Sequence, residues 1–143
     1  MGSKNDIELG VLPPFFKHYF KTTFDSKVVK ITKRKKNKIV KDRPLLRTIF
    51  NKLNFQEIMN STIAISKNEE ENVYDCLSTI VLFTKDKNGK IVERHKKVIY
   101  HIIPGKKFSS VKTIYITNEK QIRKDFDESM NLVILKKEEF TTN

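Results

Sequence analysis

The feature of this sequence with the clearest chemistry is a run of cations at residues 27–41. The run holds eight Lys and Arg residues and no carboxylate. A second segment, residues 76–112, holds nine cations against only two carboxylates, Asp86 and Glu93. Together the two segments carry more than the net charge of +12 of the whole chain. Concentrated positive charge attracts polyanions, so the expected partner is nucleic acid or an anionic membrane surface.

The cations predict two phosphate-contact patches. The first patch consists of Lys30, Lys33, Arg34, Lys35, Lys36 and Lys38. The second patch consists of Arg94, Lys96, Lys97, Lys106, Lys107 and Lys112. Lys outnumbers Arg by 24 to 5, which favours point-charge contact with phosphate over the forked base reading that Arg provides. Nucleic-acid binding should therefore depend little on base sequence, and the choice between RNA and DNA stays open.

Two other interpretations of the first run stay open. Short segments rich in Lys and Arg also serve as nuclear-localisation signals. Alternatively, the run is a solvated hairpin tip whose charge only aids solubility. In each case we expect residues 35–38 to form a polar turn, followed by a short return strand at residues 39–40.

Aromatic residues near the cations have two uses. Phe108 follows Lys106 and Lys107 in an expected loop, where its ring can stack on an unpaired base. A second group of rings lies in a neutral N-terminal arm, residues 1–26, and is expected to be buried, either against the domain or between copies of the chain. This group, which we predict to serve packing or self-association, consists of Phe15, Phe16, Tyr19, Phe20 and Phe24.

No pattern in the sequence indicates catalysis. The expected hairpin register places Cys76 opposite His101, and a Cys–His pair is the minimum that a thiol nucleophile needs. No glycine-rich oxyanion segment follows Cys76, however. An inert, half-buried thiol is therefore favoured. The consecutive carboxylates at residues 69–71 cannot converge as a metal cage on one strand face and read as a solvated loop. The sequence matches no phosphate-binding loop, dinucleotide fingerprint or zinc-hydrolase motif. We therefore expect a non-enzymatic protein with no metal and no cofactor.

Composition limits the size of the fold, the chemistry of its cysteine and the compartment expected for the protein. At 143 residues, with 38% hydrophobic and 32% charged residues, the chain fits one domain able to bury a core. The single cysteine excludes a disulfide framework. With no signal-peptide pattern and no apolar stretch of transmembrane length, we expect an intracellular protein, cytoplasmic or nuclear and not secreted. The excess of Lys, Asn and Ile indicates an A+T-rich genome such as that of a virus, mobile element or parasite.

The pattern of apolar residues predicts an α+β fold with a mostly antiparallel sheet. It divides the chain into the arm, residues 1–26, and a basic α+β domain, residues 27–143. An amphipathic helix is expected over about residues 43–53 and a short helix, capped by Asn118, over about residues 119–127. Strands are expected at residues 27–32, 61–66, 73–84, 91–103, 111–117 and 130–136.

Residues 73–84 and 91–103 form the clearest expected hairpin. Its turn contains Asn88-Gly89, the preferred pair for a two-residue turn because both positions need a positive φ. That register places Leu77, Val81 and Phe83 on one face together with Val98 and Tyr100.

The expectation for function is a largely sequence-independent nucleic-acid-binding protein that uses the two basic patches. The alternative is a small structural protein of matrix type, in which the basic face binds anionic membrane while the aromatic arm links copies into a homo-oligomer. An anionic membrane contributes about 1 kcal/mol per Lys or Arg near its surface, so the charge suffices for either.

Overall fold

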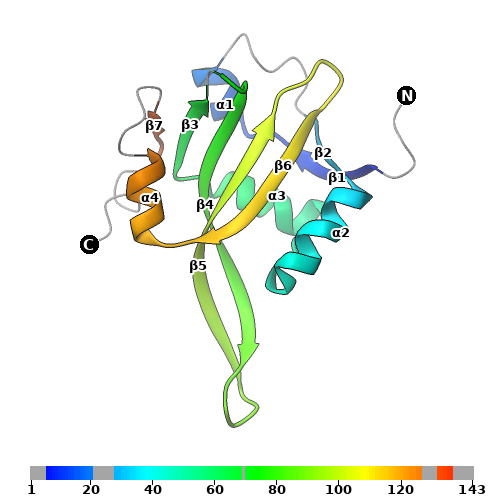
Figure 1. Cartoon of the computed structure of the whole chain (residues 1–143), viewed down its shortest axis with the longest axis vertical. Helices are drawn as coiled ribbons and strands as arrows, with labels where there is room; N and C mark the ends of the chain where they lie inside the picture. The colour runs from blue at the N-terminus through cyan, green and yellow to red at the C-terminus, as the bar shows by residue number, and fades with distance from the viewer. Residues whose placement is uncertain (1–5, 21–27, 69, 127–131, 137–143) are drawn as a thin grey trace.

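A computed structural model describes residues 6–20, 28–68, 70–126 and 132–136. These residues form one seven-stranded sheet in the order β1-β2-β6-β5-β4-β3-β7 (Figure 1). Every neighbouring pair is antiparallel except β2 and β6, which are parallel. The elements are β1 (Asp6–Val11), α1 (Pro14–Tyr19), β2 (Val28–Thr32), α2 (Lys33–Asp42), the 3₁₀ helix η1 (Pro44–Leu46), α3 (Lys52–Asn60), β3 (Ala64–Asn68), β4 (Val73–Lys85), β5 (Ile91–Ile103), β6 (Ser109–Thr117), α4 (Glu119–Phe126) and β7 (Leu132–Ile134). The predicted α+β class is confirmed.

The larger core lies between the sheet and α3, which Figure 1 shows behind the strands. Phe55 of α3 meets Tyr100 of β5 edge-on, with ring centroids 5.9 Å apart. The Thr62 hydroxyl, just after α3, lies 2.7 Å from the Tyr100 hydroxyl and donates to the Met59 carbonyl at 2.6 Å. Because both hydroxyls are buried, these bonds avoid the cost of an unpaired polar group and tie the end of α3 to the central strand.

A smaller core lies on the opposite face of the sheet, under α4. Ile122 and Phe126 are buried there against Leu77 of β4 and Ile99 of β5. The Asn118 Oδ1 accepts a hydrogen bond from the Gln121 backbone N–H at 2.9 Å, which satisfies one of the unpaired donors of the first turn. The predicted short helix and its cap are both confirmed.

The basic run forms the helix α2, so the predicted polar turn at residues 35–38 and the return strand at residues 39–40 are wrong. The Thr32 hydroxyl caps the helix by accepting a hydrogen bond from the Lys35 backbone N–H at 3.2 Å. Lys is a good helix former, and no glycine or proline interrupts α2. Ile39 is buried in the larger core and anchors one side of the helix.

The helix expected over residues 43–53 is wrong in position. This part of the chain contains the single turn η1, an irregular segment and then α3, which begins only at Lys52. The start is set by Asn51, whose Oδ1 accepts a hydrogen bond from the Asn54 backbone N–H at 2.8 Å. Leu46, Ile49 and Phe50 are still buried, because an irregular segment can bury apolar residues as a helix does.

Strands β4 and β5 form the predicted hairpin, but the register differs by one residue. Cys76 lies opposite Tyr100, and Asp75 lies opposite His101. The predicted two-residue turn is replaced by a longer loop, in which the Asp86 carboxylate accepts hydrogen bonds from the backbone N–H groups of Asn88 and Lys90, each at 2.9 Å.

The one-residue shift exchanges the two faces of β4 relative to β5. Ile80 and Leu82 therefore join Val98 in the larger core, while Val81 and Phe83, predicted to accompany Val98, point to the other side and are exposed. The grouping expected from the sequence is corrected accordingly.

The far ends of β4 and β5 project from the sheet as a two-stranded ribbon, visible at the bottom of Figure 1. Pairing with β3 ends at Leu77, and pairing with β6 ends at Lys97. Beyond these points the two strands pair only with each other, as far as Lys85 and Ile91. We call residues 81–95 the ribbon.

The arm contributes the strand β1, which the sequence did not predict. It pairs with β2 and is held by Gln56 of α3, whose Oε1 accepts from the Val11 backbone N–H at 2.7 Å while its Nε2 donates to the Val11 carbonyl at 2.8 Å. Gly10 beside it has a φ of 125°, a conformation that favours glycine. The other predicted strands correspond to β2, β3, β6 and β7 with shifted ends; residues 27, 130 and 131 lie outside the described residues.

Candidate nucleic-acid interface

The sheet face that carries the smaller core is only partly covered by α4, and the rest of it is not covered by any described helix. Strand residues alternate between faces, so Tyr115 and Thr117 of β6 lie on the α4 side with their partners Ile99 and Lys97. The exposed and half-buried residues of this surface, which we call the open face, are Lys30, Lys97, His101, Ser110, Thr113, Tyr115 and Thr117. In Figure 1, β6 crosses the front of the molecule along this face.

Tyr115 is the aromatic residue of the open face, and two basic residues from other elements meet it. The Arg43 guanidinium carbon lies 5.9 Å from the ring centroid. The His101 ring meets Tyr115 edge-on at 5.8 Å between centroids, and His101 Nε2 lies 3.4 Å from Asp75 Oδ1. Arg43 directly follows α2 as its C-cap, so the helix carries this cation to the edge of β6.

A second cation and ring meet where β2 lies beside the start of β6. Lys30 pairs with Ser110 in the parallel ladder, and its Nζ lies 4.9 Å from the centroid of the half-buried Phe108 ring. Lys106 and Lys107 are exposed in the same loop. An aromatic ring surrounded by cations can hold a base by stacking and the adjoining phosphate by charge.

The helix α2 places four cations in its first turn and no carboxylate. These residues are Lys33, Arg34, Lys35 and Lys36. The N-terminus of a helix carries a partial positive charge, so each cation there is unfavourable by about 0.3–1 kcal/mol. A bound anion would remove that penalty, because backbone N–H groups and side-chain cations would then face opposite charge.

The structure divides the predicted second patch between two ends of the sheet. Arg94 and Lys96 lie on the ribbon and just beyond it, whereas Lys106 and Lys107 lie past the opposite end of β5. The separation along the strand is roughly 30 Å at about 3.3 Å per residue. Lys30 of the first patch instead joins the loop of the second through Phe108.

The other predicted cations also have definite places. Lys97 is half-buried on the open face opposite Thr117. Lys112 forms an ion pair with Glu71, with Nζ and Oε2 3.3 Å apart. Lys38 is exposed on α2.

The predicted aromatic arm packs largely against its own chain. Phe16 is fully buried, and Phe15 and Phe20 pack against the larger core. The Phe20 ring meets the Tyr74 ring edge-on at 4.7 Å between centroids. Tyr19 is 49% exposed. The fifth predicted ring, Phe24, lies outside the described residues.

Cys76 is not in a geometry for catalysis with His101. The thiol is fully buried beside Tyr100, and burial raises its pKa well above the ordinary value, which suppresses the reactive thiolate. Cys76 pairs with Tyr100, whereas His101 pairs with Asp75, so the Cys76 and His101 side chains point to opposite faces of the sheet. Among the described residues no three His, Cys, Asp or Glu side chains gather as a metal site.

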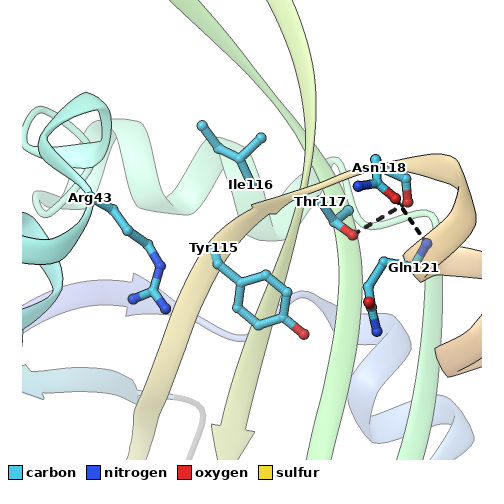
Figure 2. Close-up of a pocket in the computed structure, with 6 residues that line it drawn as sticks. All are labelled: Arg43, Tyr115, Ile116, Thr117, Asn118 and Gln121. Atoms are coloured by element: carbon cyan, nitrogen blue, oxygen red, sulfur yellow. Dashed lines mark hydrogen bonds between the residues drawn. The ribbon is translucent and has the colours of Figure 1, made fainter.

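A pocket of about 430 Å³ beside Tyr115 was not foreseen from the sequence. Its lining residues, drawn in Figure 2, are Arg43, Tyr115, Ile116, Thr117, Asn118 and Gln121. The alternation of side chains along a strand is a sequence signal that could have placed Tyr115 and Thr117 on the same face of β6. No local signal could have found Arg43, because its position depends on the path of α2.

Comparison with protein-family models, with curated proteins and with solved structures finds no match for this chain. Within the part of the chain that the structure describes, every helix is too short or too polar to cross a membrane.

Proposed function

We propose that this chain is a non-enzymatic nucleic-acid-binding protein, largely independent of base sequence, whose contact surface is the open face together with the basic start of α2. The observation that carries the proposal is the pairing of a cation with an aromatic ring at two places on this side of the sheet. Lys30 lies over Phe108, and Arg43 lies over Tyr115. Rings that stack on bases beside cations that neutralise phosphates are the chemistry that binding of single-stranded nucleic acid requires.

The excess of Lys supports binding through phosphates rather than reading of base sequence. A Lys ammonium makes a point-charge contact, which positions the strand without distinguishing bases. The protein is proposed to act inside the cell, in the cytoplasm or the nucleus, where its RNA or DNA partner is found. A nuclear-localisation signal in α2 would be a separate property of the same cations.

Salt dependence tests this proposal. If six or more phosphates are neutralised, affinity for a fluorescent single-stranded oligonucleotide should fall by ~10³-fold or more between about 50 and 200 mM salt. Changing Lys30, Lys106 and Lys107 to Gln should reduce the slope of log affinity against log salt by about 0.7 for each phosphate that is no longer neutralised.

The matched control changes three exposed lysines on other surfaces, Lys17, Lys52 and Lys136, to Gln. This variant has the same net charge as the first but should retain nearly the wild-type slope. Equal reductions in the two variants would mean that total charge alone drives binding. A binding constant that barely changes with salt would refute the proposal itself.

The ribbon favours a second candidate function, a matrix-type structural protein that binds anionic membrane and self-associates. Phe83 and Ile91 are 69% and 66% exposed and lie diagonally on one face of the ribbon. Lys85, Lys87 and Lys90 are exposed beside them. Exposed apolar residues among cations are suited to an anionic bilayer surface, or to contact with another copy of the chain.

Vesicle flotation separates the two candidates. The matrix-type candidate predicts that the chain floats with anionic vesicles but not neutral ones, and that Phe83→Ser with Ile91→Ser abolishes flotation. Leu53→Ser is the control, because Leu53 is 79% exposed on α3. Flotation unaffected by the ribbon changes would count against the membrane function, and sedimentation of the same variants tests self-association.

A further inference from the structure

We infer that the pocket beside Tyr115 is a nucleotide subsite that holds one unpaired base of a single strand, with the base stacked on Tyr115. This inference rests on the proposed function and adds to it a defined binding site and a requirement for unpaired bases. The volume of the pocket, about 430 Å³, lies within the range of small-molecule pockets, roughly 300 to 1,000 Å³. The pocket brings together three elements, the end of α2, the open face of β6 and the start of α4.

The stacking surface is held in place before any ligand arrives. The Tyr115 ring packs partly against the smaller core and is in T-shaped contact with the His101 ring, 5.8 Å away between centroids. A ring held in this way loses little side-chain entropy on binding, which favours affinity. Tyr115 is only half-buried, so part of its surface remains open to the pocket.

The Arg43 guanidinium supplies positive charge over the Tyr115 ring. Figure 2 shows it directed toward Tyr115 from the end of α2. Its distance of 5.9 Å from the ring centroid is within cation–π range. A base that stacks on this face of Tyr115 takes the place of the guanidinium, which can then contact the phosphate of the same nucleotide.

Carboxamide groups lie at the opposite side of the pocket. Figure 2 shows Gln121 beyond the hydroxyl end of Tyr115, with Asn118 above it. The Asn118 Oδ1 accepts a hydrogen bond from the Gln121 backbone N–H. This bond fixes the Asn118 side chain and leaves its amide nitrogen as a donor. Amide groups offer donors and acceptors that match the edges of bases, so this subsite should show a modest base preference in an otherwise unselective protein.

The chain contains four Tyr and no Trp, so tyrosine fluorescence can be followed without Trp emission, and comparison with Tyr115→Phe isolates the contribution of Tyr115. Adenosine monophosphate and uridine monophosphate should quench wild-type emission, whereas ribose 5-phosphate, which has the phosphate but no base, should not. In Tyr115→Phe the quenching should largely disappear while oligonucleotide affinity is retained, since Phe also stacks. Equal responses to ribose 5-phosphate and to the nucleotides would overturn the inference.

Affinity measurements give an independent result. Tyr115→Leu should lower affinity for a single-stranded oligonucleotide of about ten nucleotides by roughly 5- to 100-fold, with the salt slope and duplex affinity unchanged. Gln121→Ala should narrow the differences among homopolymers by roughly 2- to 10-fold. Thermal melts confirm that each variant is folded, and Gln121→Ala and Tyr115→Phe carry the test if Tyr115→Leu does not fold.

The failure of this inference is distinguishable from the failure of the proposed function. Salt-dependent oligonucleotide binding that is unchanged in folded Tyr115→Leu, without quenching by nucleotides in the wild type, overturns the subsite and leaves the function. Absence of any polynucleotide binding overturns both.

Discussion

Lys30 and Phe108 belong to segments far apart in the sequence, yet the Lys30 Nζ lies 4.9 Å from the centre of the Phe108 ring. The contact exists because β2 and β6 pair in parallel, with Lys30 beside Ser110. It joins one residue of the first predicted patch to the loop of the second. The two patches therefore meet here rather than along the hairpin.

Replacing Phe108 tests whether this ring stacks on a base. Phe108→Leu should lower affinity for single-stranded oligonucleotide by about 1–3 kcal/mol, the usual effect of removing one stacked base. Phe108→Tyr should retain wild-type affinity, because it keeps the aromatic face. Fluorescence anisotropy measures both variants, and an unchanged affinity in Phe108→Leu would assign the ring to packing.

Neutralising the start of α2 should change affinity and stability in opposite directions. Replacing Lys33, Arg34, Lys35 and Lys36 with Gln removes cations that would face phosphates, so polyanion affinity should fall for all base sequences. The same change removes the unfavourable charges at the helix N-terminus and should raise the free energy of unfolding by about 1–4 kcal/mol. Salt-dependent binding and urea denaturation provide the two measurements.

Lys41 provides the matched control on the same helix. It is exposed in the last turn, where a cation interacts favourably with the helix dipole. Lys41→Gln should therefore lower stability slightly. If the four-residue variant instead loses cooperative unfolding, the stems of the half-buried Lys35 and Lys36 contribute more to packing than their charges cost.

The arm should contribute strongly to stability through one side chain. Phe16 is fully buried, so Phe16→Ala should lower the free energy of unfolding by about 3–5 kcal/mol. Tyr19 is on the same helix but 49% exposed, and Tyr19→Ala should change stability by less than about 0.5 kcal/mol. Urea denaturation measures both, and similar decreases in the two variants would contradict the described packing of α1.

Stability should fall at alkaline pH because of two buried groups. Burial raises the pKa of Cys76 and of Tyr100 well above their ordinary values of 9.0 and 10.0. The unfolded chain releases these protons at the ordinary values while the folded chain retains them. Stability from this source is complete below about pH 9 and decreases as pH rises, by up to about 1.4 kcal/mol per pH unit for each group.

The difference between wild type and Cys76→Ala isolates the thiol from the many lysines that also titrate. Urea denaturation at a series of alkaline pH values should show that the variant lacks the part of the decline that begins near pH 9.0. The wild-type thiol should also resist alkylation until the protein unfolds. Parallel pH profiles for the two proteins would contradict the buried state of Cys76.

Local patterns in the sequence were enough to predict the class of fold, the clearest hairpin and the short helix after Asn118. Alternating apolar residues and a capping side chain are signals that act over a few neighbouring residues, through the period of the chain itself. The net charge and the clustering of the cations are also visible in the sequence. The expected kind of partner, a polyanion, was inferred from these two features.

The features that the sequence patterns misplaced depend partly on particular side-chain caps and partly on packing between distant segments. Whether residues 33–42 form a helix or a turn depended on the Thr32 cap and on the burial of Ile39. The hairpin register depended on an Asp86 side chain that holds the loop, and one residue of shift moved Phe83 to the exposed face. The pairing of Arg43 with Tyr115 depends on where α2 ends beside β6. The short-range caps compete with other local conformations, and which conformation forms is decided by the energy of the whole packed chain, which no local pattern encodes.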